Sequence, residues 1–326
     1  MHAELLEVLR CPSTSRPLAL EHAEYDGGRI KSGLLTVGAQ SYPIKDFIPR
    51  FVPASNYADN FGRQWNMFRE TQLDSHSGHA ISADRFWKAT GWRADDLRGK
   101  WVLDVGCGAG RFAEIALGAG AKVVALDYSG AVDACYANLK RHADLHVVQG
   151  DVYALPFARG FFQFVYSLGV LQHTPDVERA FAALPAMLAD DGRLCVDYYW
   201  RRIRTLLHPK YVLRPITKRM SQERLFALLE SNISKLLNLS RALRRVPVLG
   251  RALQRLVPVV DYSGIYPLSE EQLEEWALLD TFDMLAPQYD RPQTARTVRR
   301  WLEVAGLEDI AVFHEGHLVG RGRKRA

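Results

Sequence analysis

The sequence predicts an α/β fold built on a doubly wound parallel sheet, and three observations lead there. From Lys100 onward, short and strongly apolar runs alternate strictly with helical segments, which is typical of parallel strands joined by helices. The alternation lapses over residues 200–293, which are helix-rich, basic and broken by prolines, and it resumes from Gln293. Residues 1–54 instead hold short apolar runs between Gly- and Pro-bearing turns, which predicts a small β-rich domain after one helix.

Composition bounds what the 326-residue chain can be. Apolar residues make up 48% and charged residues 24%, as in folded proteins, and the length allows a large core. No apolar stretch approaches the roughly 20 residues of a membrane span, and the acid-containing N-terminus does not resemble a secretory signal. The four cysteines are scattered without the paired spacing of disulfides or metal knuckles, so we expect a reducing cytoplasm and no bound metal.

The predicted elements follow from hydrophobic period and from Gly and Pro positions. Residues 55–99 are expected to form a helical cap, whose aromatic stripe more often packs on a core than covers a ligand. The sheet-bearing core is expected to comprise residues 100–199 and 294–326. Its predicted strands are 101–105, 122–129, 144–151, 161–170, 193–199, 309–315 and 317–323, and its predicted helices are 111–120, 131–142, 177–192 and 294–306.

The segment VLDVGCGAGRF, residues 102–112, places three glycines at alternate positions directly after a strand, where a ligand can approach the backbone. A P-loop is excluded because Arg111 and Phe112 follow Gly110 where Lys and Ser or Thr are needed. A dinucleotide fingerprint would require its third glycine at Arg111. The remaining pattern, with Asp104 before it, suits a nucleoside that carries a zwitterionic amino-acid tail and no pyrophosphate.

These residues resemble the first motif of the class I S-adenosylmethionine-dependent methyltransferases, and further motifs follow in order at family spacing. The resemblance implies a seven-stranded Rossmann-like methyltransferase sheet and S-adenosylmethionine as cofactor. It implies that Asp127 accepts hydrogen bonds from the ribose hydroxyls, and that Tyr128 packs on the adenine. It also implies that Asp151 and Val152 contact the adenine edge. The cofactor-binding residues that it implies are Asp104, Gly106, Cys107, Gly108, Gly110, Asp127, Tyr128, Asp151, Val152, Ser167, Leu168 and Gly169.

His173 is the candidate general base. The resembled family often carries two histidines after the fourth strand, and here Gln172 replaces the first. An oxygen or nitrogen acceptor must lose a proton during methyl transfer, and histidine titrates near neutral pH. A structural histidine that caps the loop before Pro175 is an equal alternative.

The N-terminal segment resembles a small domain related to zinc ribbons and to tRNA-methyltransferase activator subunits. The stretches LLEVLRCPSTSRPL and SYPIKDFIPRF carry this resemblance. The family often has two cysteine pairs, whereas this chain has Cys11 followed by Ser13 and Thr14, and VGAQ in place of the second pair. Because one cysteine cannot build a structural zinc site, a degenerate, metal-free domain is expected.

Two further stretches, NYADNFGRQWNMFRETQLD and DTFDMLAPQYDRPQT, resemble segments of methyltransferases encoded with sugar and polysaccharide pathways. That looser resemblance suggests substrate or donor contacts, although packing is the more frequent role for any one of them. The candidate residues are Trp65, Gln72, Asp283, Tyr289 and Arg291.

Charge is concentrated in the predicted insertion, residues 200–293, which is interpreted as a substrate lid. Between Arg201 and Leu256 there are fourteen Lys or Arg and two Glu, against 28 basic and 35 acidic residues elsewhere. A solvated helical face, an anionic substrate site, peripheral contact of residues 200–256 with the inner membrane surface, and RNA binding all remain open. An acidic small substrate is preferred, RNA is disfavoured because aromatic residues are few, and no DNA partner is expected.

Together these observations predict a methyltransferase that methylates an oxygen of a sugar-containing or other natural-product small molecule, with phosphorylated, nucleotide-linked or lipid-linked acceptors included. The alternatives are N- or C-methylation of a small molecule, RNA methylation, and a non-catalytic binding module that keeps the donor fold. Neither the acceptor nor the oligomeric state can be derived from the sequence.

Overall fold

We describe a computed structural model of the chain, which covers residues 1–53, 59–202 and 209–326. The described residues form two compact units. The first comprises Met1–Arg69, Ser82–Trp200 and Arg291–Ala326, and the second comprises Glu70–Ile81 and Arg201–Asp290.

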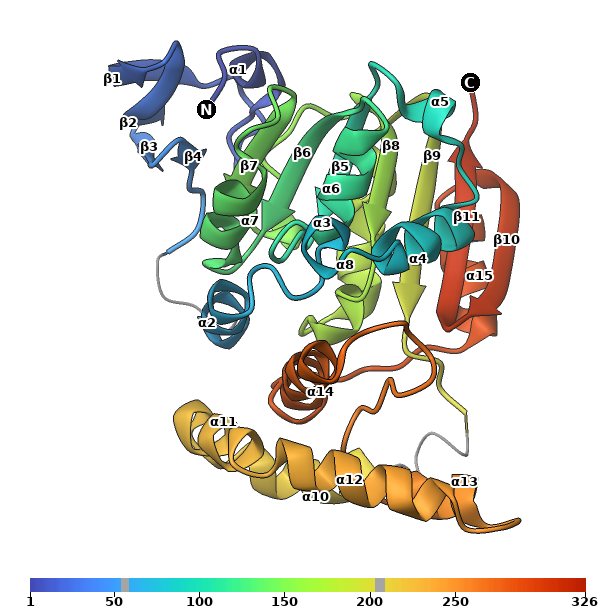
Figure 1. Cartoon of the computed structure of the whole chain (residues 1–326). Coiled ribbons are helices and arrows are strands. Elements are labelled where there is room, and N and C mark those ends of the chain that lie inside the picture. The colour runs from blue at the N-terminus through green and yellow to red at the C-terminus, as the bar shows by residue number, and fades with distance from the viewer. Residues whose placement is uncertain (54–58, 203–208) are drawn as a thin grey trace. The chain divides into compact units, whose positions relative to one another are not determined.

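A seven-stranded sheet forms the centre of the first unit, and it confirms the predicted fold class (Figure 1). Its strand order is β10-β11-β9-β8-β5-β6-β7. The strands are β5 (Trp101–Val105), β6 (Lys122–Asp127), β7 (Leu145–Gln149), β8 (Phe162–Ser167), β9 (Leu188–Tyr198), β10 (Leu307–Glu315) and β11 (His317–Lys324).

The five strands β5 to β9 run parallel, whereas β11 lies antiparallel to both β9 and β10. The prediction of a parallel sheet is therefore wrong for β11 alone, because β10, which is antiparallel to β11, runs in the same direction as β9. The reason is local, because Gly316 alone separates β10 from β11, and a tight turn can only join antiparallel neighbours.

Helices cover both faces of this sheet, as expected for a doubly wound fold. The described helices of the first unit are α1 (Leu5–Val8), α2 (Asp59–Met67), α4 (Ile81–Thr90), α5 (Ala94–Leu97), α6 (Arg111–Gly118), α7 (Ala131–Leu139), α8 (Val177–Ala183) and α15 (Ala295–Val304). Short 3₁₀ helices lie at η1 (Val152–Ala154), η2 (Leu171–His173) and η3 (Pro185–Met187).

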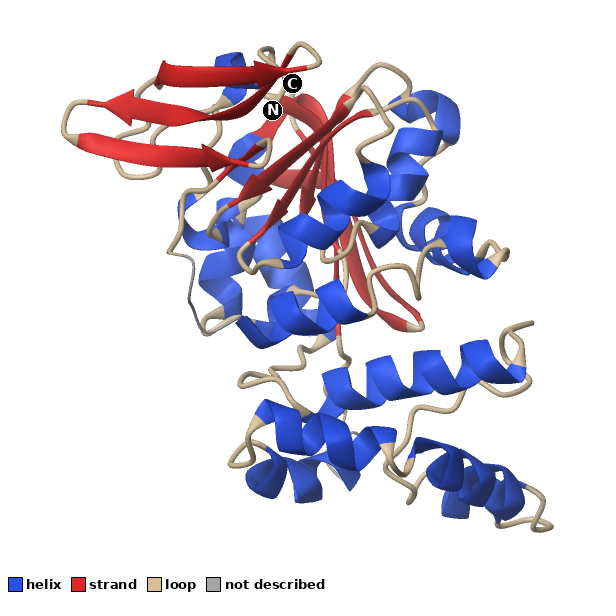
Figure 2. Cartoon of the chain, turned by 60° about the vertical axis from the view of Figure 1, so that its left-hand side comes forward, coloured by secondary structure: helices blue, strands red, loops and turns tan. Residues whose placement is uncertain are grey.

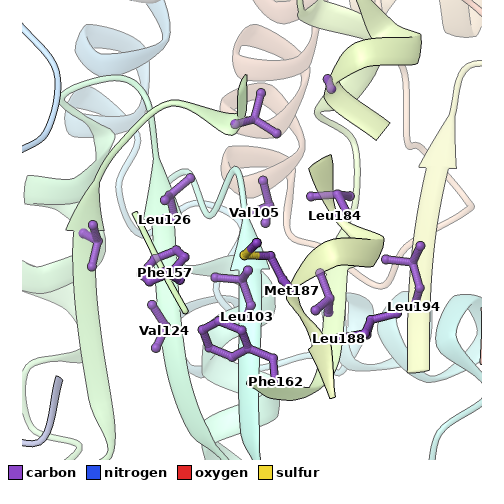
Figure 3. Close-up of a cluster of buried hydrophobic side chains, with 14 of the residues drawn as sticks. Leu103, Val105, Val124, Leu126, Phe157, Phe162, Leu184, Met187, Leu188 and Leu194 are labelled. Atoms are coloured by element: carbon purple, nitrogen blue, oxygen red, sulfur yellow. The ribbon is translucent and has the colours of Figure 1, made fainter. Parts of the chain in front are cut away.

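Alternate residues of β5 enter two separate apolar clusters, as the period of a strand requires. Val102 packs with residues of α4, α6 and α7 on one face. Leu103 and Val105 pack on the other face with residues of α8 and η3, including Leu184 and Met187 (Figure 3). Strand β5 is thus covered by apolar side chains on both faces, and its carboxyl end leads directly into the glycine turn.

One predicted helix is too long. The sequence predicts a helix over residues 177–192, but α8 ends at Ala183 and β9 begins at Leu188. Pro185 explains the stop, because it has no N–H to donate to the Phe181 carbonyl one turn earlier, and it begins η3 instead. The following segment instead extends β9, with an irregular register against β8.

The N-terminal residues form a four-stranded antiparallel sheet (Figure 2). Its strands are β1 (Ala19–Asp26), β2 (Arg29–Val37), β3 (Gln40–Lys45) and β4 (Ile48–Pro49). Gln40 joins two of its loops, since its Oε1 accepts hydrogen bonds from Cys11 Sγ at 2.8 Å and from Ser13 Oγ at 2.9 Å. No group of His, Cys, Asp or Glu that could hold a metal ion occurs among the described residues.

A buried histidine joins the N-terminal segment before α1 to the central sheet. His146 on β7 has a fully buried side chain, and its Nε2 lies 3.3 Å from Glu4 Oε1. Lys122 Nζ contacts the other Glu4 oxygen at 2.9 Å, and the His2 ring packs edge-on against His146. Burial lowers the pKa of His146 to about 4, and burial also lowers the pKa of the Met1 amino group to about 5.

We therefore expect the free energy of unfolding to fall as the pH is lowered from 6.5 towards 4. In that window the unfolded chain protonates His146 while the folded chain keeps it neutral, so acid favours unfolding. His146 alone should contribute on the order of 3 kcal/mol across the window. Urea denaturation at several pH values measures this. His146→Gln should flatten the profile and the exposed His76→Gln should not, whereas an unchanged profile in His146→Gln would contradict the assignment.

The second unit is helical in its described part. Its helices are α3 (Asp74–Ser77), α10 (Pro209–Thr217), α11 (Gln222–Glu230), α12 (Ile233–Arg244), α13 (Gly250–Gln254) and α14 (Glu270–Leu285). The two chain segments that leave the first unit towards it are paired at their start. Trp200 forms a bridge with Gln293, whose N–H donates to the Tyr199 carbonyl at 2.9 Å.

Candidate functional site

The glycine turn lies at the carboxyl end of β5 and leads into α6. Gly106, Gly108 and Gly110 all have left-handed φ angles, of +87°, +52° and +93°. The Gly106 and Cys107 amides both donate to the Leu126 carbonyl, at 2.7 and 3.0 Å. These two amides therefore tie the turn to β6, and they are not directed to a ligand.

Protein side chains occupy the space that the outer two glycines leave. A Cβ on Gly106 would lie 2.4 Å from Cγ1 of Val170, and a Cβ on Gly110 would lie 2.6 Å from Cδ1 of Leu139. The sequence predicts close approach of a ligand at these positions, but it contains no signal for these tertiary neighbours. The Cys107 side chain is buried in the apolar cluster on the α6 side of the sheet.

Trp65 of α2 covers the middle of the turn. A Cβ on Gly108 would lie 3.2 Å from Cε2 of the Trp65 indole. Asn138 fixes the chain after α2 to the same turn, because its Nδ2 donates to the Arg69 carbonyl at 2.7 Å and to the Ala109 carbonyl at 2.9 Å. Of the five predicted substrate contacts, Trp65 is the one that the structure brings to the glycine turn.

Asp127 ends β6 beside the turn. Its Oδ2 accepts the Gly108 amide at 3.0 Å, and its Oδ1 accepts the Ser129 amide at 2.8 Å and hydroxyl at 2.7 Å. Burial raises the pKa of Asp127 above its usual range. The carboxylate thus organises the loop, and it lies at the strand end where the predicted ribose contact requires it.

Asp104 is buried to 98% on β5, and its Oδ2 has no hydrogen-bond partner among the described residues. Burial raises the pKa of Asp104 to about 8. A buried carboxyl oxygen without a partner indicates a missing cationic or hydrogen-bonding group. The amino group of a zwitterionic ligand tail supplies one, so this residue fits the predicted cofactor.

Gln172 provides a second unpartnered polar group. Its side chain is fully buried in η2, and neither amide atom has a hydrogen-bond partner among the described residues. Its backbone carbonyl accepts the Arg291 amide at 2.9 Å, which brings this predicted substrate residue to η2. Because buried amides are rarely left unsatisfied, Gln172 also indicates a site for a polar ligand or water.

The remaining predicted cofactor residues end β7 and β8. Asp151 caps η1 by accepting the Tyr153 amide at 2.9 Å, and Val152 behind it is buried. Ser167 is buried, and its hydroxyl donates to the Val105 carbonyl at 2.7 Å. Tyr128, which is half-buried, follows Asp127, and its carbonyl accepts Gln149 Nε2 at 3.2 Å. Leu168 is buried, and Gly169 has a φ of +80°.

A charged cluster that the sequence analysis missed lies at the ends of β8 and β9. Asp197 is 99% buried, forms an ion pair with Arg85 of α4 at 2.8 Å, and accepts the Gly169 amide. Burial acts to raise the pKa of Asp197, but the Arg85 guanidinium outweighs it, so the carboxylate stays ionised. An acid inside the apolar run RLCVDYY was the available signal for Asp197, whereas Arg85 carries none.

His173 lies in η2 at the end of a row of rings. Its ring meets Tyr199 edge-on at 5.5 Å, and Tyr199 stacks on His317 at 5.7 Å. Burial lowers the pKa of His317 to about 4, so His317 is neutral at physiological pH. The His173 side chain itself is largely buried, at 8% exposure of the residue.

The other three predicted substrate residues belong to the second unit. Gln72 Nε2 donates to Asp280 Oδ1 at 2.9 Å, and Asp283 and Tyr289 are half-buried there. The predicted substrate residues are therefore divided between the two units.

Comparison with known proteins identifies the central segment. Residues 103–196 match a family model described as a methyltransferase domain. A demethylmenaquinone methyltransferase of Thermobifida fusca is 33% identical over 121 residues, which cover 36% of this chain and 51% of that protein. A sterol 24-C-methyltransferase of Pneumocystis carinii is 34% identical over 107 residues, which cover 31% and 28%. A tRNA U34 carboxymethyltransferase of Aeromonas hydrophila is 31% identical over 131 residues, which cover 36% and 40%.

The chain spans about half the length of these relatives, or less. It carries a methyltransferase domain, and the methyl donor of this domain is S-adenosylmethionine. Among the described helices, none combines the length and the apolar character needed to cross a bilayer.

Proposed function

We propose that the whole chain is an S-adenosylmethionine-dependent methyltransferase, and that it methylates an oxygen of a sugar-containing or other natural-product small molecule. The observation that carries the donor half of this proposal is the buried, unpartnered Oδ2 atom of Asp104 beside a turn whose geometry Asp127 holds. Relatives named for a quinone, a sterol and a tRNA share the domain, so the acceptor must be sought among several classes.

The donor supplies a methyl group already activated on a sulfonium. We assign the ribose hydroxyls to Asp127, the amino group to Asp104, and the adenine edge to Asp151 and Val152. The enzyme's main task is then to align the acceptor oxygen with the methyl group and to remove its proton. We assign the removal of that proton to His173, whose ring makes an edge-on contact with the Tyr199 ring.

This proposal is tested by label transfer. The full-length protein is incubated with radiolabelled S-adenosylmethionine and, separately, with nucleotide-linked sugars, lipid-linked sugars and RNA. Label in a sugar oxygen supports the proposal, and label only in RNA, or on nitrogen or carbon, contradicts the proposed acceptor. If calorimetry detects no donor binding, the chain is a non-catalytic module.

With the acceptor identified, His173→Ala should lower turnover by about 10²–10⁴-fold, the usual contribution of a general base. Donor affinity should change less than tenfold, because His173 is not assigned a donor contact. Gln172→Ala, at the neighbouring position, is the matched control. It should weaken ligand binding more than it changes the pH dependence of turnover. Unchanged turnover in His173→Ala would leave this histidine a structural role only.

The N-terminal sheet is proposed to be a metal-free descendant of a zinc-ribbon-like domain. The hydrogen bonds from Cys11 and Ser13 to Gln40 support this, because they join the two loops that cysteine pairs would join through a metal. The cytoplasm is the proposed location, since all four cysteines are buried free thiols, and peripheral membrane contact is assigned to residues 200–256.

A further inference from the structure

Helices α12 and α13 of the second unit are labelled in Figure 1, and exposed aliphatic side chains occur from the connection between them to the residues just after α13. We call residues 244–256 the arginine-rimmed tip. Val248 is 100% exposed, Leu249 is 60% exposed and Leu256 is 65% exposed, and Val246 is also exposed. Single exposed aliphatic residues are common, but a local group of four marks an interaction surface.

The backbone holds this tip in a fixed shape. Gly250 is buried, and a Cβ on it would lie 2.5 Å from the Arg244 carbonyl oxygen, so α13 packs directly on the end of α12. The Gly250 amide donates to the Val246 carbonyl at 2.9 Å, and the Leu249 amide donates to the Pro247 carbonyl at 2.7 Å. Val248 at the centre has a φ of +61°, which a β-branched residue rarely adopts. The turn therefore presents Val248 outward and does not fold it onto the helices.

Four exposed arginines are interspersed with the aliphatic residues along this stretch, namely Arg244, Arg245, Arg251 and Arg255. The sequence contains no acid from residue 231 to residue 260. Asp261, the first acid after this stretch, is engaged by the Ser240 hydroxyl at 2.7 Å. The tip therefore combines aliphatic side chains with uncompensated positive charge, which complements a layer of acyl chains beneath anionic headgroups.

Helix α10 of the same unit also turns apolar side chains outward. Its Lys210 is buried and contacts Asp290 at 2.8 Å, and its Arg214 donates to the Pro287 carbonyl at 2.7 Å. Val212 and Ile216, one turn apart, are 73% and 62% exposed instead. In a surface helix the apolar side chains usually face the core and the basic ones face solvent, and α10 shows the reverse. This arrangement indicates that the second unit has an apolar partner outside itself.

We propose that the arginine-rimmed tip docks on an anionic phospholipid surface. Val248 and Leu249 enter the layer below the headgroups, while the interspersed guanidinium groups bind lipid phosphates. RNA is the weaker alternative, because residues 244–256 include no aromatic side chain for base stacking, and exposed valine and leucine gain nothing from a phosphate backbone. The proposed membrane contact does not depend on donor binding. It restricts the part of the chain that contacts the membrane from residues 200–256 to residues 244–256.

Vesicle co-sedimentation of the full-length protein tests this. The vesicles contain phosphatidylcholine with or without phosphatidylglycerol, at about 0.15 M salt. We expect sedimentation only with phosphatidylglycerol. Val248→Asp/Leu249→Asp should weaken vesicle binding by about tenfold or more, because two aliphatic side chains no longer enter the acyl-chain layer. Arg245→Glu/Arg251→Glu should weaken vesicle binding by roughly 25-fold, at about fivefold for each arginine.

The matched controls lie on α11 of the same unit, where Leu228→Asp and Arg224→Glu change exposed residues of the same types outside the tip. Both should sediment like wild type. Donor calorimetry on every variant should give wild-type affinity, which shows that each one is folded. Absence of sedimentation, or equal losses in the tip and α11 variants, would overturn the proposal. So would a mobility shift with tRNA by a protein that leaves vesicles unbound.

Discussion

Replacement of Asp127 with alanine is expected to weaken donor binding by at least about 100-fold. Asp127 is assigned both ribose hydroxyls, and hydrogen bonds to a charged acceptor contribute about 1.5–3 kcal/mol each. The carboxylate also holds the Gly108 amide at 3.0 Å and so maintains the glycine turn itself. Isothermal titration calorimetry with S-adenosylmethionine measures the change, and circular dichroism establishes that the variant is folded.

Two controls separate donor binding from loop order. Ser129→Ala removes the 2.7 Å hydrogen bond from the Ser129 hydroxyl to Asp127 but keeps the carboxylate, and it should change donor affinity by less than about tenfold. Asp144→Ala removes an exposed acid just before β7 and should have no effect. A folded Asp127→Ala protein with wild-type donor affinity would refute the assigned ribose contact.

Gly106→Ala should destabilise the protein and remove donor binding together. The added Cβ would lie 2.4 and 2.5 Å from the two γ-carbons of Val170, and the residue would keep a φ of +87°. Strained backbone and overpacking each cost about 1–3 kcal/mol, so the free energy of unfolding should fall by roughly 2–5 kcal/mol. Chemical denaturation and donor calorimetry on the same preparation measure both effects.

Gly118→Ala is the matched control for this substitution. Gly118 ends α6, nothing lies within 4 Å of the position that a Cβ would take there, and its φ is not left-handed. That variant should be neutral or slightly more stable, by up to about 1 kcal/mol. Val170→Ala in the Gly106→Ala background should restore part of the lost stability. Wild-type stability of Gly106→Ala alone would show that the turn tolerates a side chain.

The sequence was sufficient for the central strands and for the turn between β5 and α6. Runs such as WVLDV and KVVALD are short, apolar and bounded by breakers, so local signals agree with the global fold there. The start of β9 could not be derived, because Leu188 pairs with Phe162 across the sheet while its local sequence continues a helical pattern. Long-range pairing overrides local propensity at this point.

In the candidate site too, residues of one local motif could be predicted from the sequence, whereas residues brought together by the fold could not. Asp104, Asp127 and the glycines belong to one local motif with fixed spacing, whereas Arg85 reaches Asp197 over 112 residues of sequence. The side chains that fill the glycine positions come from α2, α7 and the segment after β8. Tertiary neighbours of this kind have no periodic signature, so only the fold discloses them.

The pairing of Trp200 with Gln293 has a consequence for how such a chain can diversify. About ninety residues depart from and return to neighbouring positions on a rigid framework, so their removal or replacement leaves the two attachment points where they were. An exchange at this junction must also suit residues Glu70–Ile81, which belong to the same helical unit and contact it through the hydrogen bond from Gln72 to Asp280. Diversification of the helical unit therefore requires matched changes in two separate stretches of the chain, residues 70–81 and residues 201–290.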